Sequence, residues 1–202
     1  MNEVPENPMT AFDVFTIGHS NHPIDRFMAL LAEASVTAVA DVRSRPRSRR
    51  YPWFSAKRLR EALKRHDISY VPMGNSLGGR PRDPELFRDG VADYEAMAAT
   101  PEFRAGIDRV VAGMDRFRIA LMCAERDPLD CHRCLLVAPA LADRGLRVGH
   151  ILADGSIVAH AEIEQRLLAL AGGNDLFADD PAARRREAYR RQARSVAFRA
   201  KA

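Results

Sequence analysis

Short apolar segments alternate along the chain with longer stretches in which apolar residues recur every three or four positions. Apolar runs of about 4–8 residues predict buried strands, whereas the longer period predicts amphipathic helices. Strands are expected at 14–17, 36–42, 68–71, 118–122 and 148–152. Helices are expected at 23–34, 56–66, 84–98, 101–115, 132–144, 160–171 and 181–198. This alternation indicates an α/β fold, a three-layer sandwich in which a mostly parallel sheet of about five strands has helices on both faces.

Local signals mark several of the expected helix ends. Thr100 followed by Pro101 is typical of a helix start, because the hydroxyl caps a free amide and proline needs no amide partner. Ser55 is expected to cap the helix that begins at residue 56 in the same way. Gly145 is expected to end the helix at 132–144.

The length of 202 residues suits one substantial core. We expect a flexible amino-terminal stretch at 1–12, a single α/β domain at 13–172 and a basic, helical carboxyl-terminal tail at 173–202. No apolar run approaches the roughly 20 residues that cross a bilayer, so no membrane partner is expected. The first dozen residues lack the features of a secretory signal, and three clustered cysteines suit a reducing compartment. A cytoplasmic protein is therefore expected.

The positive charge is concentrated near the carboxyl terminus. The net charge is +4, while residues 179–202 hold eight basic and three acidic side chains, or +5, which leaves −1 for the rest. Only three of the 31 basic residues are lysines. The planar fork of arginine suits phosphate and carboxylate groups, although a bias toward arginine codons explains the composition equally well. The tail is either a solvated arm or a contact to nucleic acid or an acidic partner.

Residues suited to chemistry gather where the predicted strands end. Ligands of open α/β sheets bind outside the carboxyl ends of the strands. The sequence therefore predicts a cleft at this edge of the sheet. The residues at or just past the strand ends are His19 and Ser20, Asp41 and Arg43, Gly74, Gly78 and Gly79, Cys123 and Glu125, and His150 and Asp154.

The stretch 123–134 contains all three cysteines, and three hypotheses account for it. Cys131 or Cys123 is a nucleophile, activated by a helix amino end and nearby arginines. Alternatively, cysteine and histidine bind a metal, although the Cys131/Cys134 pair has no second pair and needs His19 or Cys123 from elsewhere in the fold. In the third hypothesis the stretch is structural, and Cys134 packs as a small apolar residue. We assign no metal ligands and expect no cofactor.

Two loops add to the expected cleft. The loop 43–50 has five arginines in eight residues, and the aromatic residues that follow suit phosphate contact with base stacking or simply pack on the core. The glycine-rich segment 74–79 lacks the lysine of a P-loop, which argues against a nucleoside triphosphatase. No G-x-G-x-x-G follows the first strand, which argues against a dinucleotide oxidoreductase.

Taken together, the motifs resemble the domain-of-unknown-function family 488 over residues 13–155. They are TIGHS at 16–20, DVR at 41–43, PRS at 46–48, LGG at 77–79, CAE at 123–125 and CHR at 131–133. The resemblance implies an α/β fold and a shared site without an established reaction. Its signature residues would be His19, Asp41, Arg43, Glu125, Cys131, His132 and Arg133. Cys134 and the tail are not part of the pattern.

The resulting hypothesis is an enzyme that acts on a small anionic substrate, phosphate-bearing or nucleotide-like. The candidate catalytic residues are His19, Asp41, Glu125, Cys131 and His132. The candidate substrate-binding residues are Ser20, Arg43, Gly78, Gly79 and Arg133. The alternative is a nucleic-acid-binding module that uses the arginine loop and the tail. A distant similarity to the rhodanese layout adds sulfur transfer as a minor alternative.

Overall fold

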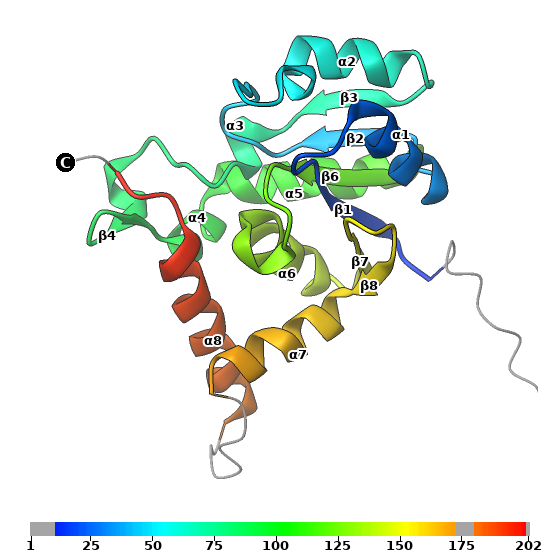
Figure 1. The fold of residues 1–202 in the computed structure, drawn as a ribbon. Coiled ribbons are helices and arrows are strands. Elements are labelled where there is room, and N and C mark those ends of the chain that lie inside the picture. The colour runs from blue at the N-terminus through cyan, green and yellow to red at the C-terminus, as the bar shows by residue number, and fades with distance from the viewer. Residues whose placement is uncertain (1–10, 173–179, 201–202) are drawn as a thin grey trace, which may run out of the picture.

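A computed structural model describes residues 11–172 and 180–200, and a six-stranded sheet lies at its centre (Figure 1). The strand order is β3-β2-β6-β1-β7-β8, in which the first five are parallel and β8 is antiparallel to β7. The α/β three-layer fold is thus confirmed, with one strand more than expected. The strands are β1 Val14–Gly18, β2 Ala38–Asp41, β3 Ser69–Pro72, β6 Ile119–Cys123, β7 Val148–Ile151 and β8 Ile157–Ala159.

Successive side chains of the strands enter two separate apolar cores. Phe15 and Ile17 of β1 pack with α1 (Ile24–Glu33) and α2 (Ala56–Lys64). Val14, by contrast, lies in the core that includes residues of α5 (Pro101–Met114), α6 (Ala138–Ala142) and α7 (His160–Leu170). Because neighbouring residues of a strand face opposite sides, one sheet supports both layers. No helix within the described ranges is long and apolar enough to cross a membrane.

The prediction of one helix at 84–98 is wrong. A single 3₁₀ turn (Pro84–Leu86) leads into a hairpin of β4 (Phe87–Arg88) and β5 (Val91–Ala92), and only α4 (Tyr94–Ala98) is helical beyond it. Asp89 and Gly90 connect the strands with φ angles of 53° and 73°. The Asp-Gly pair is the usual signal for such a hairpin turn, and the helical spacing concealed it.

The segment expected as one helix at 132–144 contains a wide turn. Arg133–Val137 is π-helical and leads directly into α6. Pro139 lies in α6 without an amide hydrogen to donate to the carbonyl four residues earlier, and the π-helical turn directly precedes α6. Gly145 has the left-handed conformation expected after the helix, with φ of 81°.

The two expected helix caps differ in outcome. Thr100 accepts a hydrogen bond from the Phe103 amide at 3.2 Å, which confirms the cap of α5. Ser55 does not cap α2, because its hydroxyl instead donates to the Ser48 carbonyl at 3.3 Å. The serine thereby ties the arginine loop to the start of α2.

The glycine-rich segment also differs from a loop, since Gly74–Leu77 forms the short helix α3.

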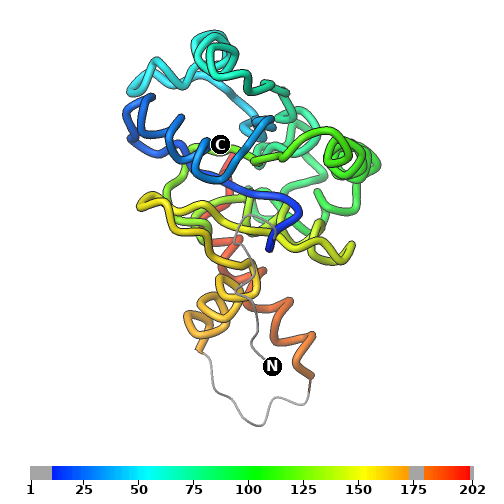
Figure 2. Tube along the Cα trace, turned by 90° about the vertical axis from the view of Figure 1, so that its right-hand side faces the viewer, coloured from blue at the N-terminus to red at the C-terminus, as the bar shows by residue number. Residues whose placement is uncertain are grey.

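The basic carboxyl-terminal segment packs on the domain. Helix α8 (Pro181–Val196) lies beside α7 at one end of the sheet (Figure 2), and its Ala188 and Ala193 are buried. The Ala92 amide of β5 donates to the Phe198 carbonyl at 2.9 Å. Three arginines of α8 pair with acidic residues of the domain, so much of the helix's charge is neutralised in place. The pairs are Arg185–Glu164, Arg190–Glu95 and Arg194–Asp89.

Most of the amino-terminal stretch expected to be flexible lies outside the described residues, which leave out 1–10, 173–179 and 201–202.

A chain of buried polar groups connects the sheet to α8. His150 of β7 lies 2.8 Å from the Thr16 hydroxyl and 3.0 Å from His160 Nδ1. Nε2 of His160 is 3.1 Å from the Tyr189 hydroxyl, which donates to Glu164 at 2.7 Å. Every ring nitrogen of His150 and His160 has a hydrogen-bond partner, so this buried network holds α7 and α8 against β7.

Replacement of Tyr189 by phenylalanine should destabilise this docking. The change leaves the buried Nε2 of His160 without its partner, which costs roughly 1–3 kcal/mol of unfolding free energy. Urea unfolding of Tyr189→Phe measures the loss, and Glu187→Gln on the exposed face of α8 is the control. Equal stability of the two variants would show that the hydroxyl does not hold the helix.

Candidate functional site

A cleft of about 720 Å³ opens at the carboxyl ends of β1, β2 and β6. These three strands are neighbours at the centre of the sheet, so the segments that follow them converge. The cleft is lined by residues 19–21 after β1, members of 43–51 after β2, and 123–126 after β6. The remaining lining residues are Gly79, Arg80, Tyr94, Asp130, His132, Val196 and Phe198.

Six of the ten predicted site residues line this cleft. They are His19, Ser20, Arg43, Gly79, Glu125 and His132. The other four lie behind the surface: Asp41, Gly78, Cys131 and Arg133. Cys131 is 1% exposed and Arg133 is 0% exposed, so these two act on the cleft through the residues in front of them.

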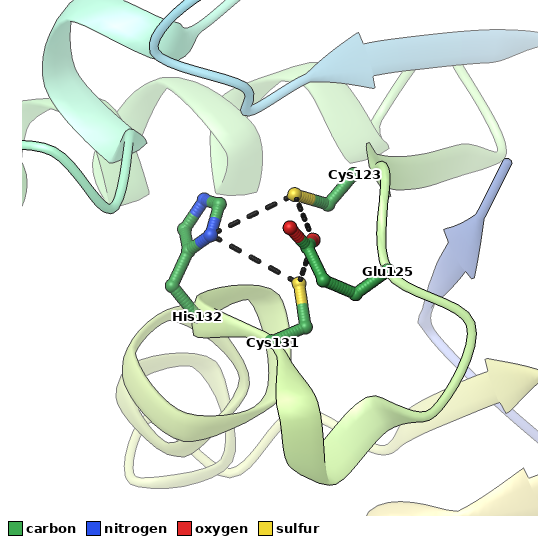
Figure 3. A group of neighbouring side chains, drawn as sticks. All are labelled: Cys123, Glu125, Cys131 and His132. Atoms are coloured by element: carbon green, nitrogen blue, oxygen red, sulfur yellow. Dashed lines mark hydrogen bonds between the residues drawn. The ribbon is translucent and has the colours of Figure 1, made fainter. Parts of the chain in front are cut away.

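Four side chains with electron-pair donors meet at the floor of the cleft (Figure 3). Glu125 Oε2 lies 2.8 Å from the Cys123 sulfur and 3.0 Å from the Cys131 sulfur. His132 Nδ1 lies 3.6 Å from Cys123 and 3.9 Å from Cys131. Cys123 ends β6, Glu125 follows it, and the other two begin the next helical segment. We call Cys123, Glu125, Cys131 and His132 the floor cluster.

The orientation of His132 is set from its far side. Its Nε2 lies 3.0 Å from the Val42 carbonyl oxygen, which has no proton to give, so Nε2 carries the proton and donates. In the neutral ring this leaves the lone pair of Nδ1 directed at the two sulfurs. Gly79 lies so close that an added Cβ would come within 2.7–2.9 Å of the His132 ring, so a side chain at position 79 would displace the ring.

Arg133 fixes the turn that carries Glu125. Its two terminal nitrogens donate to the carbonyl oxygens of Glu125 and Arg126 at 2.7 and 3.2 Å. Its backbone amide donates to the Cys131 sulfur at 3.4 Å. Gly18 is also required, because a Cβ there would collide with the Glu125 carbonyl oxygen. The buried Arg133 therefore holds the loop in place and does not reach a ligand in the cleft.

The floor cluster shares its protons unevenly. Burial raises the pKa of Glu125, and a negative Cys131 adds to this shift. Burial opposes ionisation of Cys131 as well, but the Cys123 thiol and the Arg133 charge bring the pKa of Cys131 well below its ordinary value. Burial raises the pKa of Cys123. Burial opposes protonation of His132, but the Cys131 sulfur and Glu125 raise the pKa of His132 above its ordinary value.

Arg43 and Asp41 form a buried ion pair beside the floor cluster. Asp41 accepts from Arg43 Nε at 2.8 Å and Nη2 at 2.6 Å, and also from the Tyr70 hydroxyl at 2.8 Å. Burial opposes the charge on Arg43, but the Asp41 carboxylate raises the pKa of Arg43 above its ordinary value. Asp41 is thus a positioning residue for Arg43, and its carboxylate does not line the cleft.

His19, directly after β1, is held as a neutral ring at the cleft. It stacks on Phe54 with ring centroids 4.2 Å apart, and its Nδ1 lies 2.9 Å from the Ser20 carbonyl oxygen. Burial and the Arg43 charge lower the pKa of His19 to about 4. Because Nδ1 donates to the carbonyl, Nε2 is the nitrogen that accepts a proton.

Three residues near the expected site lie elsewhere. His150 and Cys134 are buried on the other face of the sheet, close to His160. Asp154 accepts from Ser156 within its own turn. Cys131 and Cys134 therefore do not form the metal-binding pair that their spacing suggests, because one faces the cleft floor and the other faces α7 and α8.

The linear sequence did not reveal several residues of the cleft wall. Tyr94 begins α4, and Phe198 follows α8 and carries Arg80 over its ring at 5.0 Å. The sequence gives no sign that either aromatic residue lies at the cleft. The β4–β5 hairpin precedes Tyr94 and α8 precedes Phe198, and the packing of these two elements brings the aromatic residues there. The carboxyl-terminal segment is thus part of the cleft.

The shifted pKa of His19 should make stability fall in acid. The unfolded chain takes up a proton below about pH 6.5, whereas the folded protein resists protonation of His19 down to about pH 4. Stability is therefore retained above pH 6.5 and lost between 6.5 and 4, by on the order of 3 kcal/mol for this group. Urea unfolding of wild type and His19→Asn at several pH values isolates the contribution. His66→Asn, at an exposed position, is the control; an unchanged pH dependence in His19→Asn would contradict the expectation.

Comparison with known proteins gives a family. No curated protein and no solved structure matches this chain. A family model described as "Domain of unknown function DUF488" matches residues 23–139, more than half of the sequence. The matched range contains the floor cluster, Arg133 and the arginine loop, whereas His19 precedes it and Phe198 follows it. The chain therefore belongs to the DUF488 family.

Proposed function

We propose that this protein is an enzyme that binds a small phosphate-bearing substrate in the cleft and transforms it there. The observation that carries the proposal is the charge of the cleft lining. Six arginines line it against two acidic residues: Arg43, Arg45, Arg47, Arg50, Arg80 and Arg126, with Glu125 and Asp130.

Several arginines elsewhere on the described surface, such as Arg144, Arg166 and Arg190, are paired with carboxylates, although others are not. What distinguishes the cleft arginines is that they line one cavity together. Within the described ranges, Arg43 is the only arginine of the cleft that forms an ion pair. Guanidinium groups that converge without carboxylates favour an anion, and their planar fork matches phosphate oxygens.

The groups beneath the arginines support catalysis more than simple binding. His19 is neutral and has one nitrogen free to accept a proton. Its pKa of about 4 makes it a weak base on its own, and an anion bound beside it would raise that pKa toward the range of a general base. Its ordinary competitor for this role, His132, directs Nε2 to the Val42 carbonyl and Nδ1 to the cysteines. His19 is therefore the proposed base, and the exposed arginines hold the anion above it.

The nucleic-acid alternative has less support. Arg185, Arg190 and Arg194 of α8 are paired with acidic residues, so the segment does not present a free basic arm. Phe198 lines the same cleft as the arginine loop, so removal of the tail would open the cleft as well as remove charge. Sulfur transfer through Cys131 also has little support, since that thiol lies behind the cleft surface.

Binding is tested with loop variants. Arg47 lines the cleft and Arg49 does not, although both are exposed in the same loop. Arg47→Ala should weaken binding of inorganic phosphate or a 5′-nucleoside monophosphate about tenfold or more, because a hydrogen bond to a charged group contributes roughly 1.5–3 kcal/mol. Calorimetric titration of the full chain measures this, with Arg49→Ala as the matched control.

Other outcomes separate the alternatives. Equal weakening by Arg47→Ala and Arg49→Ala, together with salt-sensitive binding of a short oligonucleotide, would favour a nucleic-acid surface. Wild-type affinity in Arg47→Ala would overturn the proposed anion site.

Catalysis is tested at His19. A panel of phosphate monoesters and diesters is screened for turnover by the full chain, and His19→Asn is compared on any substrate found. Loss of a general base should lower kcat by roughly 10²–10⁴-fold while phosphate affinity is kept. A variant with wild-type kcat would remove His19 from the mechanism.

A further inference from the structure

We propose that the floor cluster is a zinc site, with Cys123, Cys131, His132 and Glu125 as ligands. This inference is independent of the proposed function, because it concerns the donors of the floor and not the arginines above them. Two thiolates, one imidazole and one carboxylate are donors that tetrahedral zinc commonly takes. All four donor atoms lie within 4.8 Å of one another.

The distances from His132 match this coordination. Zinc bonds of about 2.3 Å to sulfur and 2.0–2.1 Å to nitrogen, at tetrahedral angles, separate the two donors by roughly 3.5 Å. Nδ1 lies 3.6 and 3.9 Å from the two sulfurs. The Glu125 oxygen lies closer, at 2.8 and 3.0 Å, because it shares protons with the sulfurs. When the metal displaces those protons, rotation of the carboxylate about its last bond lengthens both contacts.

The far side of His132 has the arrangement expected of a metal ligand. Metal-binding histidines donate their other ring N–H to a carbonyl or carboxylate, which fixes the ring and raises its basicity. Nε2 of His132 donates to Val42 in this way. Nδ1 faces only two sulfurs, which are weak hydrogen-bond partners for a fully buried nitrogen. A metal ion would satisfy that lone pair.

The charges of the site balance when zinc is bound. Zn²⁺ with two thiolates, one carboxylate and a neutral imidazole carries a net charge of −1. The guanidinium of Arg133 is buried, donates only to carbonyl oxygens and is in no ion pair among the described residues. A buried charge of this kind needs a nearby opposite charge, and the zinc-loaded cluster, like the metal-free one, supplies it. Asp41 and Arg43 neutralise each other and leave this balance unchanged.

The second group of possible ligands does not have these features. Cys134, His150 and His160 also lie close together. Each ring nitrogen of the two histidines already has an oxygen or nitrogen partner within 3.1 Å, in the buried hydrogen-bond network that connects Thr16 to Tyr189. No lone pair is left facing Cys134, so this group fits a structural hydrogen-bond network.

Zinc in the floor cluster would face the cleft. Cys123, Glu125 and His132 line the cleft, whereas Cys131 closes the cluster from behind. The metal would therefore be within reach of an anion held by the arginines. Binding should release protons, since cysteine binds zinc as the thiolate.

The test measures metal content and spectra of the full chain. Chelator-treated protein is reloaded with Zn²⁺ or Co²⁺, and the metal content is measured by mass spectrometry. We expect one ion per chain and sulfur-to-cobalt charge-transfer absorption with tetrahedral visible bands. Cys131→Ser and Glu125→Gln should each lower zinc affinity by more than the 10–100-fold that outer-shell changes cost. Cys134→Ser is the matched control and should bind as wild type.

Several results would overturn the proposal. Folded wild type that binds no zinc at micromolar concentration, or a cobalt complex without thiolate absorption, contradicts it directly without any variant. Zinc lost in Cys134→Ser but kept in Cys131→Ser would place the ion in the second group. Arg47→Ala should keep its zinc whatever its phosphate affinity, so failure of one proposal is distinguishable from failure of the other.

Discussion

The buried guanidinium of Arg133 is the interaction on which the site depends. It holds the carbonyl groups of Glu125 and Arg126, and the lack of a side chain at Gly18 lets this turn approach β1. Without these hydrogen bonds the Glu125 carboxylate would leave the two thiols. The charge of Arg133 would be costly if it were isolated, so it requires the negative groups that it positions. The loop and the floor cluster therefore stabilise each other.

The order of the strands decides which side chains meet. Strands β2, β6 and β1 are adjacent, and each delivers one part of the cleft: the Asp41–Arg43 pair, Cys123 with Glu125, and His19. His150 is in β7, next to β1, yet it faces the opposite layer. A residue at the end of a parallel strand thus reaches the cleft where its side chain, or the loop after it, turns toward the arginine loop.

Much of this arrangement could be predicted from the sequence, because strand ends and their polar residues are local features. The carboxyl-edge rule correctly indicated where His19, Arg43 and Glu125 lie, but it holds for every parallel strand and therefore also included His150 and Asp154. Strand order and side-chain direction depend on tertiary packing, which no local pattern encodes. The same limit applies to Phe198, since a basic amphipathic helix gives no sign of the surface on which it packs. The Asp89-Gly90 turn, by contrast, had a local signal that the helical spacing outweighed.

The family match divides the cleft into two parts. The matched range of 23–139 contains all four residues of the floor cluster, Arg133 that positions them and the loop that carries most of the arginines. His19 and Phe198 come from segments outside it. With zinc bound, Arg133 would neutralise the floor, so the six arginines and Asp130 would set the field at the mouth of the cleft. The matched part would then supply the metal donors and the attraction for anions. The flanking segments would supply the proposed base His19 and Phe198 of the aromatic wall, where substrates of equal charge would be distinguished.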